Sequence, residues 1–288
     1  MKYAITHQTT YTYNALVLLE PHVLRLRPRS DGYQQLRDFN LSIVPEPKGI
    51  THLLDAEGNT LTRCWWNNTR VEQLSITAMS EVETFCTRPF DYLLELWATQ
   101  LPLDYPTALL SHLQPYLTST GGMVGIDGAA NQLAHEIAHQ VQWNPVIFLG
   151  ELNQRIYRQL SYQERETGFP LPPSLTWAQQ IGTCRDFVVL FMAVCRAVGL
   201  AARFVSGYEE GSPECEQTLH AWVEVYLPGA GWRGYDPTHG LVVSDRHIAI
   251  AASGWPRYAA PVTGTHQGGS GDPATLNSHI SILKQETA

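Results

Sequence analysis

The sequence predicts an α+β fold: a β-sandwich-like domain at the N-terminus, followed by a core in which a cysteine-bearing helix packs on an antiparallel sheet. Two observations support this. Residues 1–90 contain short segments of alternating polar and apolar residues, separated by turn-forming residues. Beyond residue 90 helical patterns dominate, up to a strongly apolar helix with three strand-like segments after it. We therefore expect a β-rich domain at 1–90, a linker at 91–130 and a core at 131–288.

The strands expected in the first part are short and regularly spaced, which is typical of a β-sandwich. Gly, Pro, Asp and Asn cluster between them at 29–32, 45–49 and 57–59, where we expect turns. The segments with strand-like alternation are ITHQTTYTY, HVLRLRP, FNLSIVPEP, LTRCWWNN and VEQLSITAMSEVETF.

The core is expected to contain amphipathic helices at 131–142 and 149–164, where apolar residues recur at helical spacing. A more uniformly apolar helix should run from Cys184 to Val198, with Thr183 as its N-cap and Gly199 ending it. Strands are expected to follow at 201–208, 219–226 and 231–235, with a last one at 278–283.

The charge and composition argue against several classes of protein. The net charge is −8 and no Lys/Arg cluster occurs, so we expect no nucleic-acid partner. The first residues lack an apolar leader segment, and the longest apolar run, 187–194, is too short to cross a bilayer. Five irregularly spaced cysteines indicate reduced thiols. We expect a cytoplasmic protein without membrane association, whose oligomeric state the sequence leaves open.

The first candidate functional residue is Cys184, in the segment IGTCRDF. It falls in the first turn of the apolar helix, where the helix dipole favours a thiolate over a thiol. Free backbone N–H groups at such a helix start can also stabilise an oxyanion. The position therefore suits a nucleophile.

His220 and Asp236 complete a possible triad. His220 opens the strand HAWVEVY and could serve as general base and acid for a nearby thiol. Asp236 ends the next strand, GWRGYD, which follows a Pro-Gly turn. Because this is hairpin geometry, the Asp236 carboxylate can lie beside His220 and hold the imidazole in its useful tautomer.

The segments GTCRDF, HAWVEV and GWRGYDPT closely resemble the core of bacterial transglutaminase-like proteins, which share a papain-like cysteine-enzyme core. The resemblance implies that Cys184, His220 and Asp236 are the catalytic Cys, His and Asp of this family. It also implies a preceding β domain. One departure is His239, where the family often has Asn.

A competing motif is His135-Glu136-Ile137-Ala138-His139, a literal H-E-x-x-H on a predicted helix. In zinc hydrolases of this type the two histidines bind zinc and the glutamate activates water. A third ligand would be required, for which Glu151, Glu164 or Glu166 is available. The alternative is a solvated helix face, which we favour because the triad segments lie elsewhere.

The sequence thus favours cysteine-dependent acyl transfer at an amide bond of a peptide or protein, through a thioester on Cys184, with no metal or cofactor required. Hydrolysis by a peptidase or amidase is preferred, because transfer to an amine needs a cleft that excludes water. The alternatives are protein-glutamine amine transfer, zinc-dependent hydrolysis with His135 and His139, and a non-catalytic interaction module.

Overall fold

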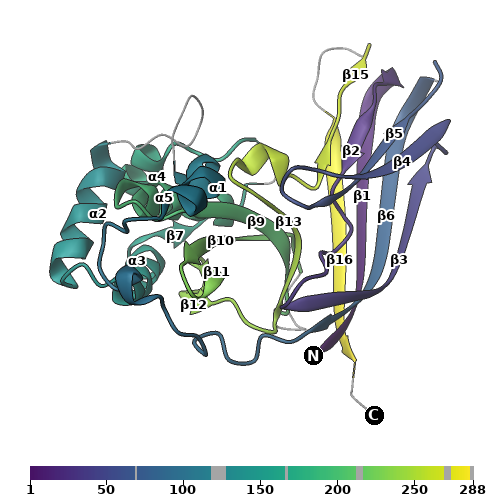
Figure 1. Ribbon diagram of the computed structural model, residues 1–288. Helices are drawn as coiled ribbons and strands as arrows, with labels where there is room; N and C mark the ends of the chain where they lie inside the picture. Colours follow the sequence, from purple (N-terminus) through teal and green to yellow (C-terminus); the bar gives the residue numbers. More distant parts are fainter. Residues whose placement is uncertain (69, 118–127, 166–167, 212–216, 269–273, 286–288) are drawn as a thin grey trace.

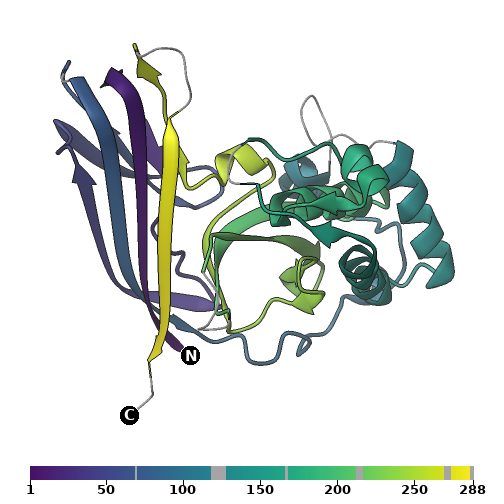
Figure 2. The same cartoon turned by 180° about the vertical axis from the view of Figure 1, so that it is seen from behind.

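The computed structural model describes residues 1–68, 70–117, 128–165, 168–211, 217–268 and 274–285. Figures 1 and 2 show two parts side by side: a β domain built from long strands, and a core with helices packed around a smaller sheet. This confirms the predicted α+β fold with an N-terminal β domain.

The β domain consists of two antiparallel sheets that enclose a shared apolar core. The longer sheet has the order β15-β1-β6-β3, with β16 also paired to β1; its strands are β15 (His266–Gln267), β1 (Lys2–Leu19), β6 (Arg70–Thr84), β3 (Gln34–Val44) and β16 (Thr275–Gln285). The second sheet has the order β14-β2-β5-β4; its strands are β14 (Val262–Thr263), β2 (His22–Leu24), β5 (Thr60–Trp65) and β4 (Gly49–Leu54).

One face of β1 meets three different surroundings along its length. Alternate residues of a strand share a face, and in β1 these are the odd-numbered ones. Tyr3 and Ile5 pack against strands of the core, whereas Tyr13 and Val17 pack between the two sheets of the β domain. Between these clusters, His7 lines a cleft. The same strand therefore joins the two domains and forms one wall of the space between them.

The core sheet is antiparallel, with the order β12-β11-β10-β9-β13. Helix α5 packs on β9 and β10, and α2, α3 and α4 pack on α5. The elements are η1 (Leu96–Ala98), α1 (Thr107–Leu117), α2 (Gly128–Gln140), α3 (Pro145–Gln159), β7 (Ser161–Tyr162), α4 (Pro173–Gln179), β8 (Ile181–Gly182), α5 (Cys184–Ala197), β9 (Ala202–Glu209), β10 (His220–Leu227), β11 (Gly231–Asp236), β12 (Leu241–Val242), β13 (His247–Ser253) and η2 (Pro256–Tyr258).

Helix α5 is the centre of the core. Its residues from Phe187 to Val194 are all buried, as expected of a helix that is apolar on every side. Gly199 follows the helix with φ +77°, the left-handed conformation that ends a helix and favours glycine. The predicted helix boundaries therefore hold to within a residue. Helix α3 begins earlier than predicted because Asn144 caps it, accepting hydrogen bonds from the N–H groups of Val146 and Ile147.

The chain returns to the β domain at its end. Strand β16 pairs with β1 from Lys2 to Thr12, whereas the expected division placed 131–288 in the core. The last strand thus extends the first sheet beside β1 and forms one of its edges. Among the described residues, no helix combines the length and the apolar character needed to cross a membrane.

Candidate active site

Cys184 is the first residue of α5, and its side chain lines the cleft between the domains. Asp186 fixes this end of the helix: its carboxylate accepts hydrogen bonds from the backbone N–H and the hydroxyl of Thr183, at 2.8 and 3.0 Å. These bonds satisfy donors that a helix start would otherwise leave free. The cysteine is therefore held at a rigid helix terminus.

Asp186 also ties the loop beside the cleft to this helix. Its second oxygen accepts from the Leu171 N–H at 2.7 Å and from Arg165 at 2.9 Å. Gly182 lies in β8, where a Cβ atom would come within 2.9 Å of the Asp186 Cβ. The glycine is needed to leave room for the aspartate.

His220 opens β10 and lies between Cys184 and Asp236. Its Nε2 is 2.7 Å from Oδ2 of Asp236, and Cys184 is close enough to help raise the pKa of the imidazole. Because Nε2 faces the carboxylate, Nδ1 is the nitrogen left for the thiol. The structure thus brings together the three residues that the sequence singled out.

The surroundings of His220 and Asp236 favour the charged form of both side chains. Burial opposes a charge on His220, but Asp236 outweighs it, so that the pKa of His220 is raised well above its ordinary value. Burial would raise the pKa of Asp236, yet the imidazoles of His220, His239 and His247 hold it well below its ordinary value. Asp236 therefore stays a carboxylate beside an imidazole that readily carries a proton.

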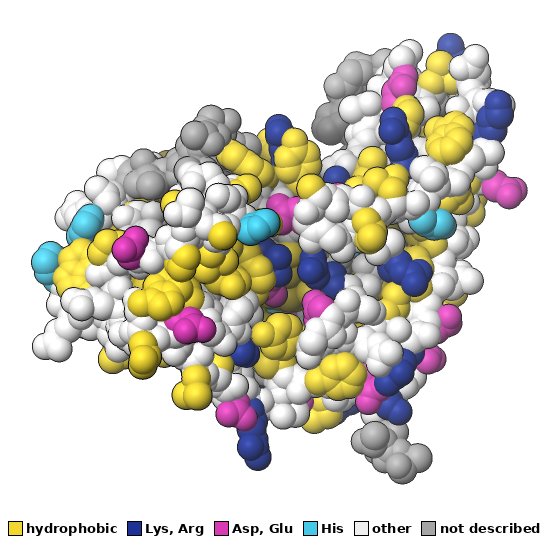
Figure 3. All heavy atoms as spheres, viewed as in Figure 1, with side chains coloured by type: hydrophobic (Ala, Val, Ile, Leu, Met, Phe, Trp, Pro, Cys, Tyr) yellow, Lys and Arg dark blue, Asp and Glu magenta, His cyan; other side chains and the backbone are white. Residues whose placement is uncertain are grey.

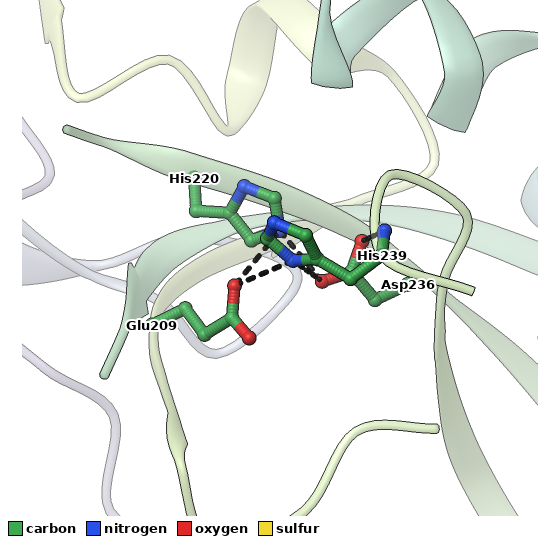
Figure 4. A group of neighbouring side chains, drawn as sticks. All are labelled: Glu209, His220, Asp236 and His239. Carbon is green, nitrogen blue, oxygen red and sulfur yellow. Dashed lines mark hydrogen bonds and ion pairs between the residues drawn. The ribbon is translucent and has the colours of Figure 1, made fainter. Parts of the chain in front are cut away.

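Three further titratable side chains surround Asp236, and sequence analysis had assigned none of them a role. His239 Nδ1 lies 3.1 Å from Asp236 Oδ2 and 2.8 Å from Glu209 Oε2. His247 Nε2 lies 3.4 Å from the same Asp236 oxygen. Glu209 pairs with His247 across β9 and β13 and shares a sheet face with His220, so strand alternation could have indicated its position. Figure 4 shows Glu209, His220, Asp236 and His239 converging.

The cleft that exposes this site has a volume of about 880 Å³ and lies between the two domains. Cys184, His220 and Tyr162 line it from the core, and Thr9 and Asn277 line it from the β domain. Tyr162 is close enough to Cys184 for their charges to interact. The β domain therefore forms part of the candidate active site.

The other described cysteines differ from Cys184 in their surroundings. Cys195, Cys64 and Cys86 do not line the cleft, and burial raises the pKa of all three, that of Cys64 to about 11. A raised thiol pKa disfavours the nucleophilic thiolate. Cys215 lies outside the described residues.

The H-E-x-x-H segment lies on the solvent side of α2. His135 and His139 are exposed and both contact the ring of Trp143. Glu136 is paired with Arg155 at 2.8 Å. Within the described ranges, no further metal-ligating side chain joins these two histidines in a site.

Charged side chains of both signs are spread over one face of the molecule. On the face shown in Figure 3, Lys and Arg side chains are interspersed with Asp and Glu.

Comparisons with known proteins agree with this fold. Residues 3–83 match the family described as bacterial transglutaminase-like N-terminal region, and residues 133–237 match the transglutaminase-like superfamily. The second match contains Cys184, His220 and Asp236. The chain therefore belongs to the transglutaminase-like superfamily and carries the N-terminal domain of its bacterial members.

Individual relatives extend over different parts of the chain. An uncharacterized protein of Mycobacterium tuberculosis is 27% identical over 266 residues, which cover 86% of this chain and 82% of the relative. A protein-glutamine gamma-glutamyltransferase of Pseudomonas aeruginosa is 30% identical over 127 residues, covering 38% of this chain and 18% of that protein. A crystal structure from Cytophaga hutchinsonii, proposed to be a cysteine protease, has a TM-score of 0.77 at 22% identity and covers 100% of this chain and 92% of its own. This last likeness shows the shared fold.

Proposed function

We propose that this protein is a cysteine-dependent enzyme that cleaves an amide bond in a peptide or protein through a thioester on Cys184. The observation that carries the proposal is that Cys184 and His220 line an interdomain cleft together, while the buried Asp236 holds His220 from behind. A nucleophile, a base that contacts it and a carboxylate that orients the base are the parts required for nucleophilic acyl transfer.

The first half-reaction forms the thioester. The Cys184 sulfur attacks the amide carbon, and the carbonyl electron pair moves to the oxygen, which N–H groups at the start of α5 stabilise. His220 then transfers its proton to the leaving nitrogen as the C–N bond breaks. Asp236 keeps the imidazole oriented throughout.

The second half-reaction decides the class of enzyme. We favour water as the acceptor, since exposed polar residues such as Asn277 and Arg257 line the cleft and leave it open to solvent. His220 takes a proton from water, the oxygen attacks the thioester, and the C–S bond breaks to release the acid. Amine transfer is the second candidate, because the Pseudomonas aeruginosa relative is a protein-glutamine gamma-glutamyltransferase.

Mass spectrometry of the reaction with a peptide library tests this proposal. The reaction is run with and without an added primary amine and is stopped with acid to preserve the thioester. We expect an acyl adduct on Cys184 and products bearing a new carboxyl group, even when the amine is present. Products joined to the amine would assign the protein to amine transfer instead. An acyl adduct absent from Cys184 under all conditions would overturn the proposal.

A further inference from the structure

Two of the four side chains in Figure 4 are not required for the triad. Glu209 comes from the end of β9, and His239 lies in the turn after β11. Both direct an atom toward the point where His220 meets Asp236. The ligand atoms of Glu209, His220, Asp236 and His239 all lie within 4.8 Å of one another.

The separations within this cluster suit a tetrahedral zinc ion. Zinc binds nitrogen and carboxylate oxygen at about 2.0–2.2 Å, which places neighbouring ligand atoms roughly 3.3–3.6 Å apart. Here Nε2 of His220 is 2.7 Å from Asp236 Oδ2 and 3.7 Å from Glu209 Oε2. Nδ1 of His239 is 2.8 Å from Glu209 Oε2 and 3.1 Å from Asp236 Oδ2. Shifts of less than 1 Å would bring these atoms to the required distances.

The types of ligand in the cluster, and the contacts that orient these ligands, also suit zinc. Two imidazoles and two carboxylates form a ligand set typical of zinc, and the two carboxylate charges balance a divalent cation. The unused oxygen of Asp236 accepts the Thr238 N–H at 2.9 Å, and His247 lies 3.8 Å from the unused oxygen of Glu209. Such outer contacts orient metal ligands. The side chain of His239 is 47% exposed, which gives an ion access from solvent.

We propose that Glu209, His220, Asp236 and His239 form an inhibitory Zn²⁺ site that switches the triad off. This role rests on the proposed function. An imidazole that binds zinc through Nε2 is neutral and keeps its proton on Nδ1, so it can neither accept a proton from the thiol nor readily release one to the leaving amine. Zinc also occupies the Asp236 oxygen that orients His220. The ion is thus an inhibitor of the site and takes no part in the reaction.

Zinc binding is measured first in Cys184→Ala, which lacks the thiol but retains the four ligands. The full-length variant is freed of metal with a chelator and titrated with Zn²⁺ against a chromophoric chelator. We expect one ion per chain and at least tenfold weaker binding in Cys184→Ala combined with His239→Asn or with Glu209→Gln. His135→Asn with His139→Asn is the matched control and should leave the affinity unchanged. The absence of stoichiometric binding, or binding that neither ligand substitution weakens, would overturn the site.

Inhibition is measured separately, in the protein with Cys184 intact. Stoichiometric Zn²⁺ should slow alkylation of Cys184 and any amide cleavage, and a chelator should restore both. His239→Asn should resist inhibition while it keeps the triad. A site that binds zinc without slowing either reaction, or that is activated by it, would contradict the inhibitory role. Because binding is measured without Cys184, failure of the proposed enzyme function would leave the binding result intact.

Discussion

His220 and Asp236 meet at 2.7 Å although they are not directly opposite each other in the β10–β11 hairpin. The ladder pairs Val223 with Tyr235, so Asp236 falls opposite Trp222 and diagonally across from His220. Diagonal positions on one face of an antiparallel pair are within reach of long side chains. The hairpin register therefore sets the distance on which the proposed chemistry depends.

Replacing Asp236 with Asn should lower kcat/KM by about 100-fold or more, because the amide cannot stabilise a protonated His220 and can hold the wrong tautomer. Steady-state kinetics on the substrate found with the peptide library measures the loss. Asp245→Asn, on the loop before β13, is the control. A decrease of less than tenfold in Asp236→Asn would show that the carboxylate has no orienting role.

The three triad residues could be predicted because each stands in a short segment whose local structure is determined nearby. Thr183 and Gly199 bound the helix that presents Cys184, and a turn ending at Gly231 fixes the hairpin that joins His220 to Asp236. Residues that cap helices or form turns act on the chain only a few positions away, so the helix ends and the hairpin turn can be predicted from the sequence itself.

The remainder of the site depends on contacts between distant segments and could not be predicted in the same way. His247 reaches Asp236 because β13 returns to pair with β9. The cleft has a second wall because β16 pairs with β1, although these strands stand at opposite ends of the sequence. Strand alternation gives the face of each residue, but it does not specify which strands become neighbours.

Replacing Asp186 with Ala should lower the free energy of unfolding by about 2–4 kcal/mol, because its carboxylate caps α5 and accepts from Leu171 and Arg165 while fully buried. Urea unfolding measures the loss. Asp186→Asn, which keeps the size but not the charge, should be intermediate. A loss below 1 kcal/mol in Asp186→Ala would contradict this role.

His7 should make the protein less stable in acid. Burial lowers its pKa from 6.5 to about 4, so between these pH values the unfolded chain binds a proton that the native state does not. The free energy of unfolding should therefore fall as the pH decreases from 6.5 to 4, by at most about 3 kcal/mol from this residue.

Urea unfolding of His7→Gln across that pH range tests whether His7 causes the loss of stability in acid. The variant should show a shallower decline than the wild-type protein, and His279→Gln, at an exposed position of β16, should not. If the free energy of unfolding falls equally steeply with decreasing pH in His7→Gln and in the wild-type protein, His7 is excluded as the source of the acid sensitivity.

Narrowing the cleft from the β domain should impair large substrates selectively. Asn277 lines the cleft from β16, so Asn277→Trp should raise KM for a peptide at least several-fold and leave alkylation by iodoacetamide unchanged. Leu283→Trp is a matched control, because Leu283 is exposed on the same strand but does not line the cleft. An unchanged KM in Asn277→Trp would show that substrates do not contact the β domain.

The identity of the nucleophile is tested most directly by site-resolved alkylation. The protein is treated briefly with limiting iodoacetamide, digested, and analysed for the rate of modification at each cysteine. We predict that Cys184 reacts fastest, that Cys184→Ala abolishes the fast phase, and that Cys195→Ala leaves it unchanged because Cys195 is fully buried in α5. A fast phase that persists in Cys184→Ala would contradict the central claim that Cys184 is the activated thiol.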